Sequence, residues 1–333
     1  MSRTRAVVTA ALAAAAIAPA TPASAAGTTV YNDIPYAAAE PETSRGHLLD
    51  LYVPDGRGQR PLLIATGGSA WLGDDGKEFA EELAGHFTAA GYVVAGVSVR
   101  SSAQARFPAQ VHDIKAAIRW LRANAREYRI DPARVAVIGD SSGGWTATMA
   151  GVTGDVRWLE GDVGVRRGSS RVQAVVDLYG PTDFTRMDAA MLPGACDFFN
   201  DLMGLTDCHD DIGSPESLLV GCAIQTCVPR VQAANPIRYV SRHDPPFLIV
   251  HGQQDMLVPH NQSELLYPAL QRACVPATFF SVPGVGHSRD VLSPDNAESV
   301  VRATAHCRGV TPRATRPTLD TIENFLDRAL RQP

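Results

Sequence analysis

The feature that most constrains this chain is a series of short apolar runs separated by segments of helical periodicity. Most of these runs end in glycine, as buried parallel strands often do. They span residues 61–68, 91–99, 134–140, 172–180, 246–252 and 277–284. Between the second and third runs, apolar residues recur at helical spacing from Val111 to Leu121. Strands that alternate with helices predict right-handed βαβ crossovers, and therefore an α/β fold with a mostly parallel central sheet flanked by helices.

The pattern is interrupted in two places. Two strand-like segments, residues 29–31 and 47–53, come first with no helix between them, which predicts an antiparallel edge. Residues 184–236 lose the alternation and hold four of the six cysteines. We expect this segment to be a disulfide-bearing insertion over the sheet and the active site, within a single domain at residues 27–333. A helix at residues 318–330 is expected to close the chain.

Residues 1–26 have the pattern of a secretory signal peptide. Arg3 and Arg5 precede an apolar run, and Ala23-Ser24-Ala25 provides a small-residue cleavage pattern. The apolar run is shorter than the roughly 20 residues of a membrane span, and no later stretch is long enough. We therefore expect a secreted protein without a membrane span.

The remaining composition excludes some partners and indicates covalent cross-links. The net charge of −5 and the lack of a basic run argue against nucleic acid binding. Six cysteines in an exported chain predict three disulfides, for which fifteen connectivities exist. Proximity favours neighbour pairing, which gives the pairs Cys196–Cys208, Cys222–Cys227 and Cys274–Cys307. We expect no metal, since the cysteines and histidines lack zinc-site spacing, and no organic cofactor.

The turn Gly139-Asp140-Ser141-Ser142-Gly143 can be interpreted in two ways. It nearly matches the G-D-S-G-G run of chymotrypsin-like proteases, and it fits the G-x-S-x-G nucleophile elbow of the α/β-hydrolase fold. A chymotrypsin-like domain is all β, with its serine last of the three catalytic residues. Here Ser141 follows a buried strand and more than half of the chain follows Ser141. The sequence therefore favours the α/β-hydrolase elbow, with Ser141 as the nucleophile.

The residues that would activate this serine follow in the order that the fold requires. A serine hydroxyl needs a neighbouring imidazole as base, and the imidazole needs a carboxylate to orient it. Asp255 comes just after the run 246–252, and His287 comes just after the run 277–284. Serine, acid and histidine at successive strand ends predict a Ser141–Asp255–His287 triad.

Other candidates are less well placed. His112 is expected within a helix and His251 at a strand end, both in structural roles. His306 adjoins Cys307 in an expected loop, and no strand positions Asp290. Asp140 is expected to support the turn at the nucleophile by hydrogen bonds.

The oxyanion that forms during acyl transfer needs preorganised N–H donors. Ser142, directly after the nucleophile, supplies one. The loop Thr66–Trp71 should supply others, from Gly68 and Ser69, with Gly68 preferred because glycine lets the backbone approach the substrate. The alternative for this loop is an ordinary glycine turn. Four aromatic residues could line a pocket but equally suit the core: Trp71, Trp145, Phe198 and Phe199.

Residues 107–144 and 244–287 resemble the bacterial carboxylesterase branch of the α/β hydrolases that includes feruloyl-esterase-like enzymes. The resemblance covers roughly residues 48–287 without the cysteine-bearing insertion. By motif it assigns the family's nucleophile, acid and base to Ser141, Asp255 and His287, and it implies hydrolysis of carboxylic esters without a cofactor. The chain departs from the family at its oxyanion loop, where Thr66-Gly67-Gly68-Ser69 replaces the usual H-G-G-G.

Together these observations predict a secreted serine esterase acting on a small-molecule or polysaccharide-linked ester. Two alternatives stay open. One is a peptidase or amidase on the same fold, since fold does not fix the substrate. The other is a catalytically silent binding protein, which the altered oxyanion loop would favour.

Overall fold

The computed structural model describes residues 27–305 and 307–331, so the expected signal peptide, residues 1–26, lies outside the described residues. These residues build a ten-stranded sheet in the order β1-β2-β4-β3-β5-β6-β7-β8-β9-β10. The strands are β1 Thr28–Pro35, β2 Leu48–Pro54, β3 Arg60–Thr66, β4 Val93–Val97, β5 Ile130–Asp140, β6 Ala174–Leu178, β7 Phe247–Gly252, β8 Ala277–Val282, β9 Val300–Ala305 and β10 Arg308–Gly309. The strands from β4 to β8 pair in parallel. The predicted mostly parallel sheet is confirmed.

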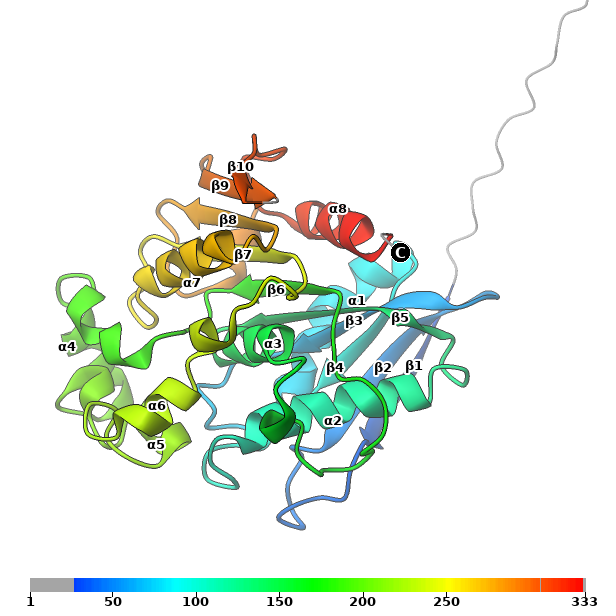
Figure 1. Cartoon of the computed structure of the whole chain (residues 1–333), viewed down its shortest axis with the longest axis horizontal. Helices are drawn as coiled ribbons and strands as arrows, with labels where there is room; N and C mark the ends of the chain where they lie inside the picture. Colours follow the sequence, from blue (N-terminus) through cyan, green and yellow to red (C-terminus); the bar gives the residue numbers. More distant parts are fainter. Residues whose placement is uncertain (1–26, 306, 332–333) are drawn as a thin grey trace, which may run out of the picture.

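Helices cover both faces of the sheet (Figure 1). They are α1 Phe79–Ala89, α2 Ala109–Ala123, α3 Ser142–Val152, α4 Ala195–Met203, α5 Pro215–Val220, α6 Val228–Ala233, α7 Asn261–Arg272 and α8 Leu319–Leu330. Apolar residues of α2, α3 and α7 form one core layer with the sheet. Those of α1 and α8 form a second layer on the opposite face. No helix within the described ranges is long and apolar enough to cross a bilayer.

The two edges of the sheet differ in how well the sequence predicted them. The antiparallel edge of β1 and β2 was predicted. The antiparallel strands β9 and β10 at the other edge were not, because the region around Cys307 had no alternation strong enough to indicate a strand. The outer strand β9 buries few side chains, so its sequence carries little apolar signal. The Cys274–Cys307 disulfide ties this edge to the end of α7.

The segment between β6 and β7 contains α4, α5 and α6, which lie together at one side of the molecule (Figure 1). Two disulfides, Cys196–Cys208 and Cys222–Cys227, form within it, so all three predicted pairings are confirmed. Its apolar residues pack against Trp71 and Trp145. Trp145 also donates from Nε1 to the carbonyl of Ala234 at 2.8 Å. The segment therefore contacts the elements around Ser141.

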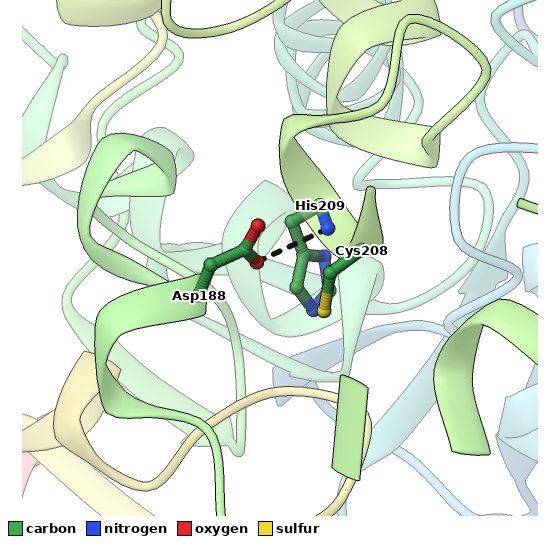
Figure 2. A group of neighbouring side chains, drawn as sticks. All are labelled: Asp188, Cys208 and His209. Carbon is green, nitrogen blue, oxygen red and sulfur yellow. Dashed lines mark hydrogen bonds between the residues drawn. The ribbon is translucent and has the colours of Figure 1, made fainter. Parts of the chain in front are cut away.

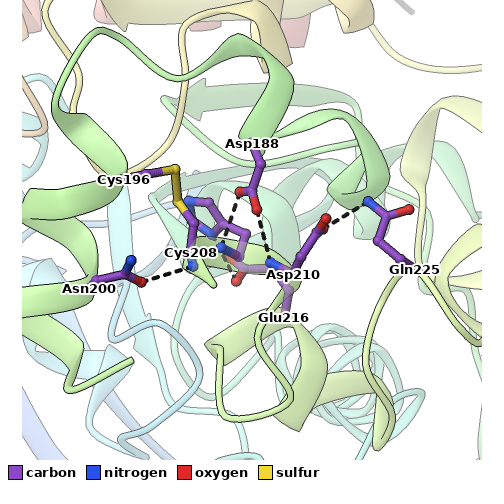
Figure 3. The surroundings of a disulfide bond; sticks show 8 residues. Asp188, Cys196, Asn200, Cys208, Asp210, Glu216 and Gln225 are labelled. Atoms are coloured by element: carbon purple, nitrogen blue, oxygen red, sulfur yellow. Dashed lines mark hydrogen bonds and ion pairs between the residues drawn. A yellow bond between two sulfur atoms is a disulfide. The ribbon is translucent and has the colours of Figure 1, made fainter. Parts of the chain in front are cut away.

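A buried polar cluster holds this segment together. The Asp188 carboxylate accepts the N–H groups of His209 and Asp210, each at 3.1 Å (Figure 3). His209 Nδ1 lies 3.0 Å from Glu216 Oε2. Burial would lower the pKa of the His209 imidazole, but Glu216 outweighs that effect and raises it. The Cys196–Cys208 disulfide adjoins this cluster, because Cys208 directly precedes His209.

Potential ligand atoms of Asp188, Cys208 and His209 lie within 4.8 Å of one another (Figure 2). The Cys208 sulfur is bonded to Cys196, however, and cannot act as a thiolate ligand. The Asp188 oxygens are occupied by backbone N–H groups. This group therefore does not fit a metal site and serves to fix the local fold.

Asp177 on β6, beneath α3, gives a pH-dependent contribution to stability. Burial raises the pKa of its carboxyl to about 6. Its Oδ1 accepts from Gly180 at 2.9 Å, whereas Oδ2 has no partner among the described residues. The folded state therefore binds this proton more tightly than the unfolded chain, where aspartate titrates near about 4. Stability from this group is fully present below about pH 4 and is lost as pH rises through about 6.

Asp177→Asn removes this titration. Between pH 4 and pH 8, the unfolding free energy of the wild type should fall by about 2 to 3 kcal/mol relative to that of the variant, because only the wild type loses the Asp177 proton. Denaturant unfolding at several pH values measures it, with the exposed Asp162→Asn as control. Parallel stability curves for wild type and Asp177→Asn would contradict the prediction.

Candidate active site

Ser141 lies in a sharp turn between β5 and α3, at the carboxyl edge of the sheet. Its backbone has φ 52° and ψ −126°, a conformation that is strained for any residue except glycine. A Cβ on Gly139 would lie 2.1 Å from the Gly143 oxygen, and one on Gly143 would lie 2.1 Å from the Thr66 oxygen. Both glycines are therefore required by close backbone approach, and the turn holds Ser141 at the start of α3.

The structure brings Ser141, Asp255 and His287 together. His287 Nε2 lies 2.9 Å from Ser141 Oγ, and His287 Nδ1 lies 2.7 Å from Asp255 Oδ2. The ring of Tyr179 packs edge-on against His287, with 4.8 Å between ring centres. Since an ionised carboxylate only accepts, Nδ1 of a neutral His287 carries the proton and Nε2 presents its lone pair to the serine hydroxyl.

The Asp255 carboxylate is fully buried and hydrogen-bonded at both oxygens. Oδ1 accepts from the N–H groups of Leu257 and Val258, each at 2.9 Å. Oδ2 faces His287 on one side and, at 3.2 Å, Nε2 of His251 on the other. Burial alone would raise the pKa of Asp255, but the hydrogen bonds from His251 and His287 outweigh it and hold the pKa well below its usual range. This carboxylate is therefore ionised at neutral pH.

His251 contacts the Asp255 carboxylate on the side away from His287. Its Nε2 faces two acceptors, the Val258 carbonyl at 3.0 Å and Asp255, so this nitrogen must carry a proton. Its Nδ1 lies 2.8 Å from the Ser263 hydroxyl. The sequence assigned His251 a structural role only. Its position four residues before Asp255, at the end of the same strand, was the available signal for this contact.

The loop predicted to hold an oxyanion is tied to the elbow by side chains. Gly68 N–H donates to Asp140 Oδ1 at 2.9 Å, and Ser69 N–H donates to Ser142 Oγ at 2.9 Å. Trp71 N–H also reaches Ser142 Oγ, at 3.3 Å. Ser142 N–H, the first of α3, has no acceptor within the described part of the chain. Of the three predicted donors, Gly68 and Ser69 therefore have other acceptors in this conformation.

Asp140 connects three loops around the nucleophile. Besides the Gly68 N–H, its carboxylate accepts from Arg289 Nε at 3.1 Å and lies 3.4 Å from the Tyr179 hydroxyl. Arg289 stands two residues after His287, pairs with Glu82, and lies over the Phe79 ring. The sequence predicted a supporting role for Asp140 but missed Arg289 and Tyr179, since neither belongs to a motif.

The remaining candidates lie apart from the triad or outside the described residues. His112 lies in α2, where its Nε2 faces the Trp158 carbonyl at 3.3 Å. Asp290 is exposed. His306 lies outside the described residues. Of the four aromatic candidates, Phe198 is exposed and the other three are buried: Trp71, Trp145 and Phe199.

A polar cavity of about 320 Å³ adjoins the elbow. Gly68 and Arg289 form the side nearest Ser141 and His287. The rest of the lining includes four carboxylates, those of Asp75, Glu78, Glu81 and Glu82. A polyhydroxylated group would find hydrogen-bond acceptors there. Chemically, the whole arrangement can transfer a proton from a serine hydroxyl to an imidazole and hold the resulting cation against a buried carboxylate.

Known proteins resemble this chain over most of its length. Residues 49–270 match the family described as BD-FAE. The probable carboxylic ester hydrolase LipM of Mycobacterium tuberculosis is 28% identical over 77% of this chain and 56% of its own length. Esterase LipQ of the same bacterium is 28% identical over 84% of this chain and 62% of its own length. The chain thus spans less than two thirds of these curated relatives.

Two solved structures are also similar. A truncated form of a carbohydrate esterase from gut microbiota is 30% identical, with a TM-score of 0.75, covering 93% of this chain and 99% of that one. A bifunctional GH43-CE protein of Bacteroides eggerthii is 32% identical, with a TM-score of 0.72, covering 90% of this chain and 38% of that one.

Proposed function

Because this chain belongs to the BD-FAE family of α/β-hydrolase carboxylesterases, we propose that it is a secreted serine esterase with Ser141, Asp255 and His287 as its triad. The observation that carries the proposal is the continuous hydrogen-bonded row from Ser141 Oγ through His287 to the buried Asp255 carboxylate. The same three residues follow one another in the order that this fold uses.

The mechanism follows from this row. His287 Nε2 takes the Ser141 proton as Oγ attacks the ester carbonyl carbon, and Asp255 stabilises the imidazolium. When the tetrahedral intermediate collapses, His287 returns the proton to the leaving alcohol and an acyl-enzyme remains. Water then attacks the acyl carbon with His287 as base, and His287 gives this proton to Ser141 Oγ as the bond to the serine breaks and the carboxylic acid is released. Apart from the ester and this water, the steps use Ser141, Asp255 and His287 and the N–H donors of the oxyanion site.

We place the oxyanion beside the Ser142 N–H, with Gly68 and Ser69 in the opposite wall. The Ser142 N–H needs no rearrangement to donate. The Ser69 N–H now donates to a neutral hydroxyl, and an oxyanion is the stronger acceptor, so this donor can be shared. The Gly68 N–H is held by a carboxylate and is the least available of the three.

Gly68→Ala should close this site. The new Cβ would lie 2.6 Å from the Ser141 Cβ, 2.5 Å from the Asp140 oxygen and 3.2 Å from the Ser142 nitrogen. Because this Cβ would obstruct the Ser142 N–H, we expect kcat for p-nitrophenyl acetate to fall by about 10²- to 10³-fold, the effect of losing one oxyanion donor. The control is Gly85→Ala, because nothing lies within 4 Å of a Cβ there. Activity at wild-type level in Gly68→Ala would place the oxyanion elsewhere.

We propose a sugar-linked acyl group, such as an acetyl or feruloyl ester, as the substrate class. The similarity to a carbohydrate esterase supports this choice, as does the carboxylate-lined cavity beside the elbow. Secretion is supported by the signal-peptide pattern of residues 1–26 and by three disulfides, which persist in oxidising compartments. We propose that the 184–236 insertion caps the site within one domain of residues 27–333.

Parallel assays test the proposed function. Mature protein from residue 27 is given p-nitrophenyl acetate, butyrate and octanoate, acetylated xylan, and the matching p-nitroanilides. Faster turnover of esters than of anilides supports an esterase, and release of acetate from xylan supports the sugar-linked class. Faster anilide turnover would instead indicate an amidase. No turnover, together with no labelling of Ser141 by a phosphonate, would indicate a silent binding protein.

A further inference from the structure

A second cavity lies at the opposite end of the sheet from Ser141. It has a volume of about 600 Å³, is open to solvent on one side, and is lined by the amino ends of β7 and β8, residues 303–305 of β9, residues 310–314 and α8. Asp255 and His287 follow the carboxyl ends of β7 and β8, so the length of these strands separates the two sites. Small-molecule sites occupy about 300–1,000 Å³, so this cavity is large enough for a ligand of its own.

The lining of the cavity combines apolar side chains with a few polar ones. The rings of Phe280 and Phe325 lie on this face of the sheet, with α8. The ring of Phe247 packs on the other face, against Gly151 of α3, so only the backbone of Phe247 borders the cavity. Pro246 and Pro276 precede β7 and β8 and carry no N–H. Three polar side chains in the lining already donate to backbone carbonyls of the chain: Thr304, Thr321 and Asn324.

The charges in the cavity are of one sign. Arg313 and Arg328 are the charged residues of its lining, and no carboxylate lines it. Among the described residues, neither guanidinium group forms an ion pair. Burial and the neighbouring Arg313 together lower the pKa of Arg328. An anion placed between the two groups would relieve their repulsion.

We propose that this cavity binds an amphipathic carboxylate, such as a medium-chain fatty acid. Its carboxylate lies between Arg313 and Arg328, and its alkyl chain lies against Phe280 and Phe325. Arginine forms charge-assisted and often bidentate hydrogen bonds with carboxylates, which gives the site its preference for an acid over an alcohol. The proposal goes beyond ester hydrolysis and does not depend on it.

Calorimetric titration of decanoate into the Ser141→Ala protein tests the site without turnover. We expect decanoate to bind at one site. Decanol should bind there only weakly, and decyltrimethylammonium should not bind. Adding Arg313→Gln and Arg328→Gln should weaken decanoate binding by at least about 10-fold for each guanidinium lost. The control is Arg331→Gln, since Arg331 lies beyond the end of α8, pairs with Asp327 and is not in the lining.

A second variant separates loss of the site from loss of the fold. Ala329→Trp fills the cavity and leaves both arginines in place, so it should also abolish binding while circular dichroism and Tm stay at wild-type values. Absent decanoate binding, equal binding by the double arginine variant, or equal binding of decyltrimethylammonium would overturn the proposal. Each result stands apart from the esterase assay, in which Arg313→Gln and Arg328→Gln, combined in the protein that keeps Ser141, should leave p-nitrophenyl acetate turnover unchanged.

Discussion

In the Ser141→Ala variant, kcat for p-nitrophenyl acetate is expected to fall by about 10⁶-fold, to the level left by binding and oxyanion stabilisation alone. The substitution removes the only atom that can form the acyl-enzyme in the proposed mechanism. In the backbone conformation of the elbow, alanine is no more strained than serine, so the variant should keep the fold. Initial rates measured on equal amounts of wild-type and variant protein, with Tm recorded for both, give the comparison.

Ser142→Ala is the matched control, since it removes a neighbouring hydroxyl and leaves the nucleophile. Its Oγ accepts from Ser69 and Trp71, so the oxyanion loop should loosen and kcat should fall by no more than about 10²-fold. Equal rates for wild type and Ser141→Ala would reject the triad for these esters. In that case the amidase and silent-binding alternatives would remain.

Asp255→Asn should lower kcat by about 10⁴-fold. The asparagine amide oxygen can still accept from Leu257 and Val258, which leaves its NH₂ group facing His287 and His251. The asparagine NH₂ and the Nδ1–H of His287 are both donors and cannot bond to each other. The ring therefore takes the other tautomer, with its proton on Nε2. That tautomer cannot accept the Ser141 proton. The pH–rate profile measures the change, because direct deprotonation of the variant's serine by hydroxide should make its rate rise with pH.

The control for Asp255→Asn is Asp290→Asn, which neutralises an exposed carboxylate three residues from His287. We expect rates within about twofold of wild type, because screening reduces the influence of a solvated charge. A large loss in Asp290→Asn with little loss in Asp255→Asn would move the acid of the triad to Asp290.

The sequence predicted the sheet and the grouping of the three candidate catalytic residues for one physical reason. Buried parallel strands are short apolar runs, and their carboxyl ends meet at one edge of the sheet, so residues that follow Asp140, Gly252 and Val282 must lie close together. Disulfide pairing followed from proximity along the chain. The positions of the apolar runs and the spacing of the cysteines can both be determined from the sequence alone.

What the sequence did not predict depends on contacts between distant residues. Asp140 and Arg289 are 149 residues apart, and their ion pair belongs to no motif. The acceptors of the Gly68 and Ser69 N–H groups are set by loops that meet only in the folded chain. Strand β9 was missed because an edge strand buries few side chains and needs little apolar sequence.

Two of the three disulfides begin and end inside the segment between β6 and β7, joining cysteines 12 and 5 residues apart. Neither of these disulfides therefore cross-links the segment to the sheet, and its apolar residues pack on Trp71 and Trp145. Such a segment can accumulate substitutions, insertions or deletions while it keeps its own shape, provided this contact survives. Over evolution, such changes would leave in place the strands that position Ser141, Asp255 and His287.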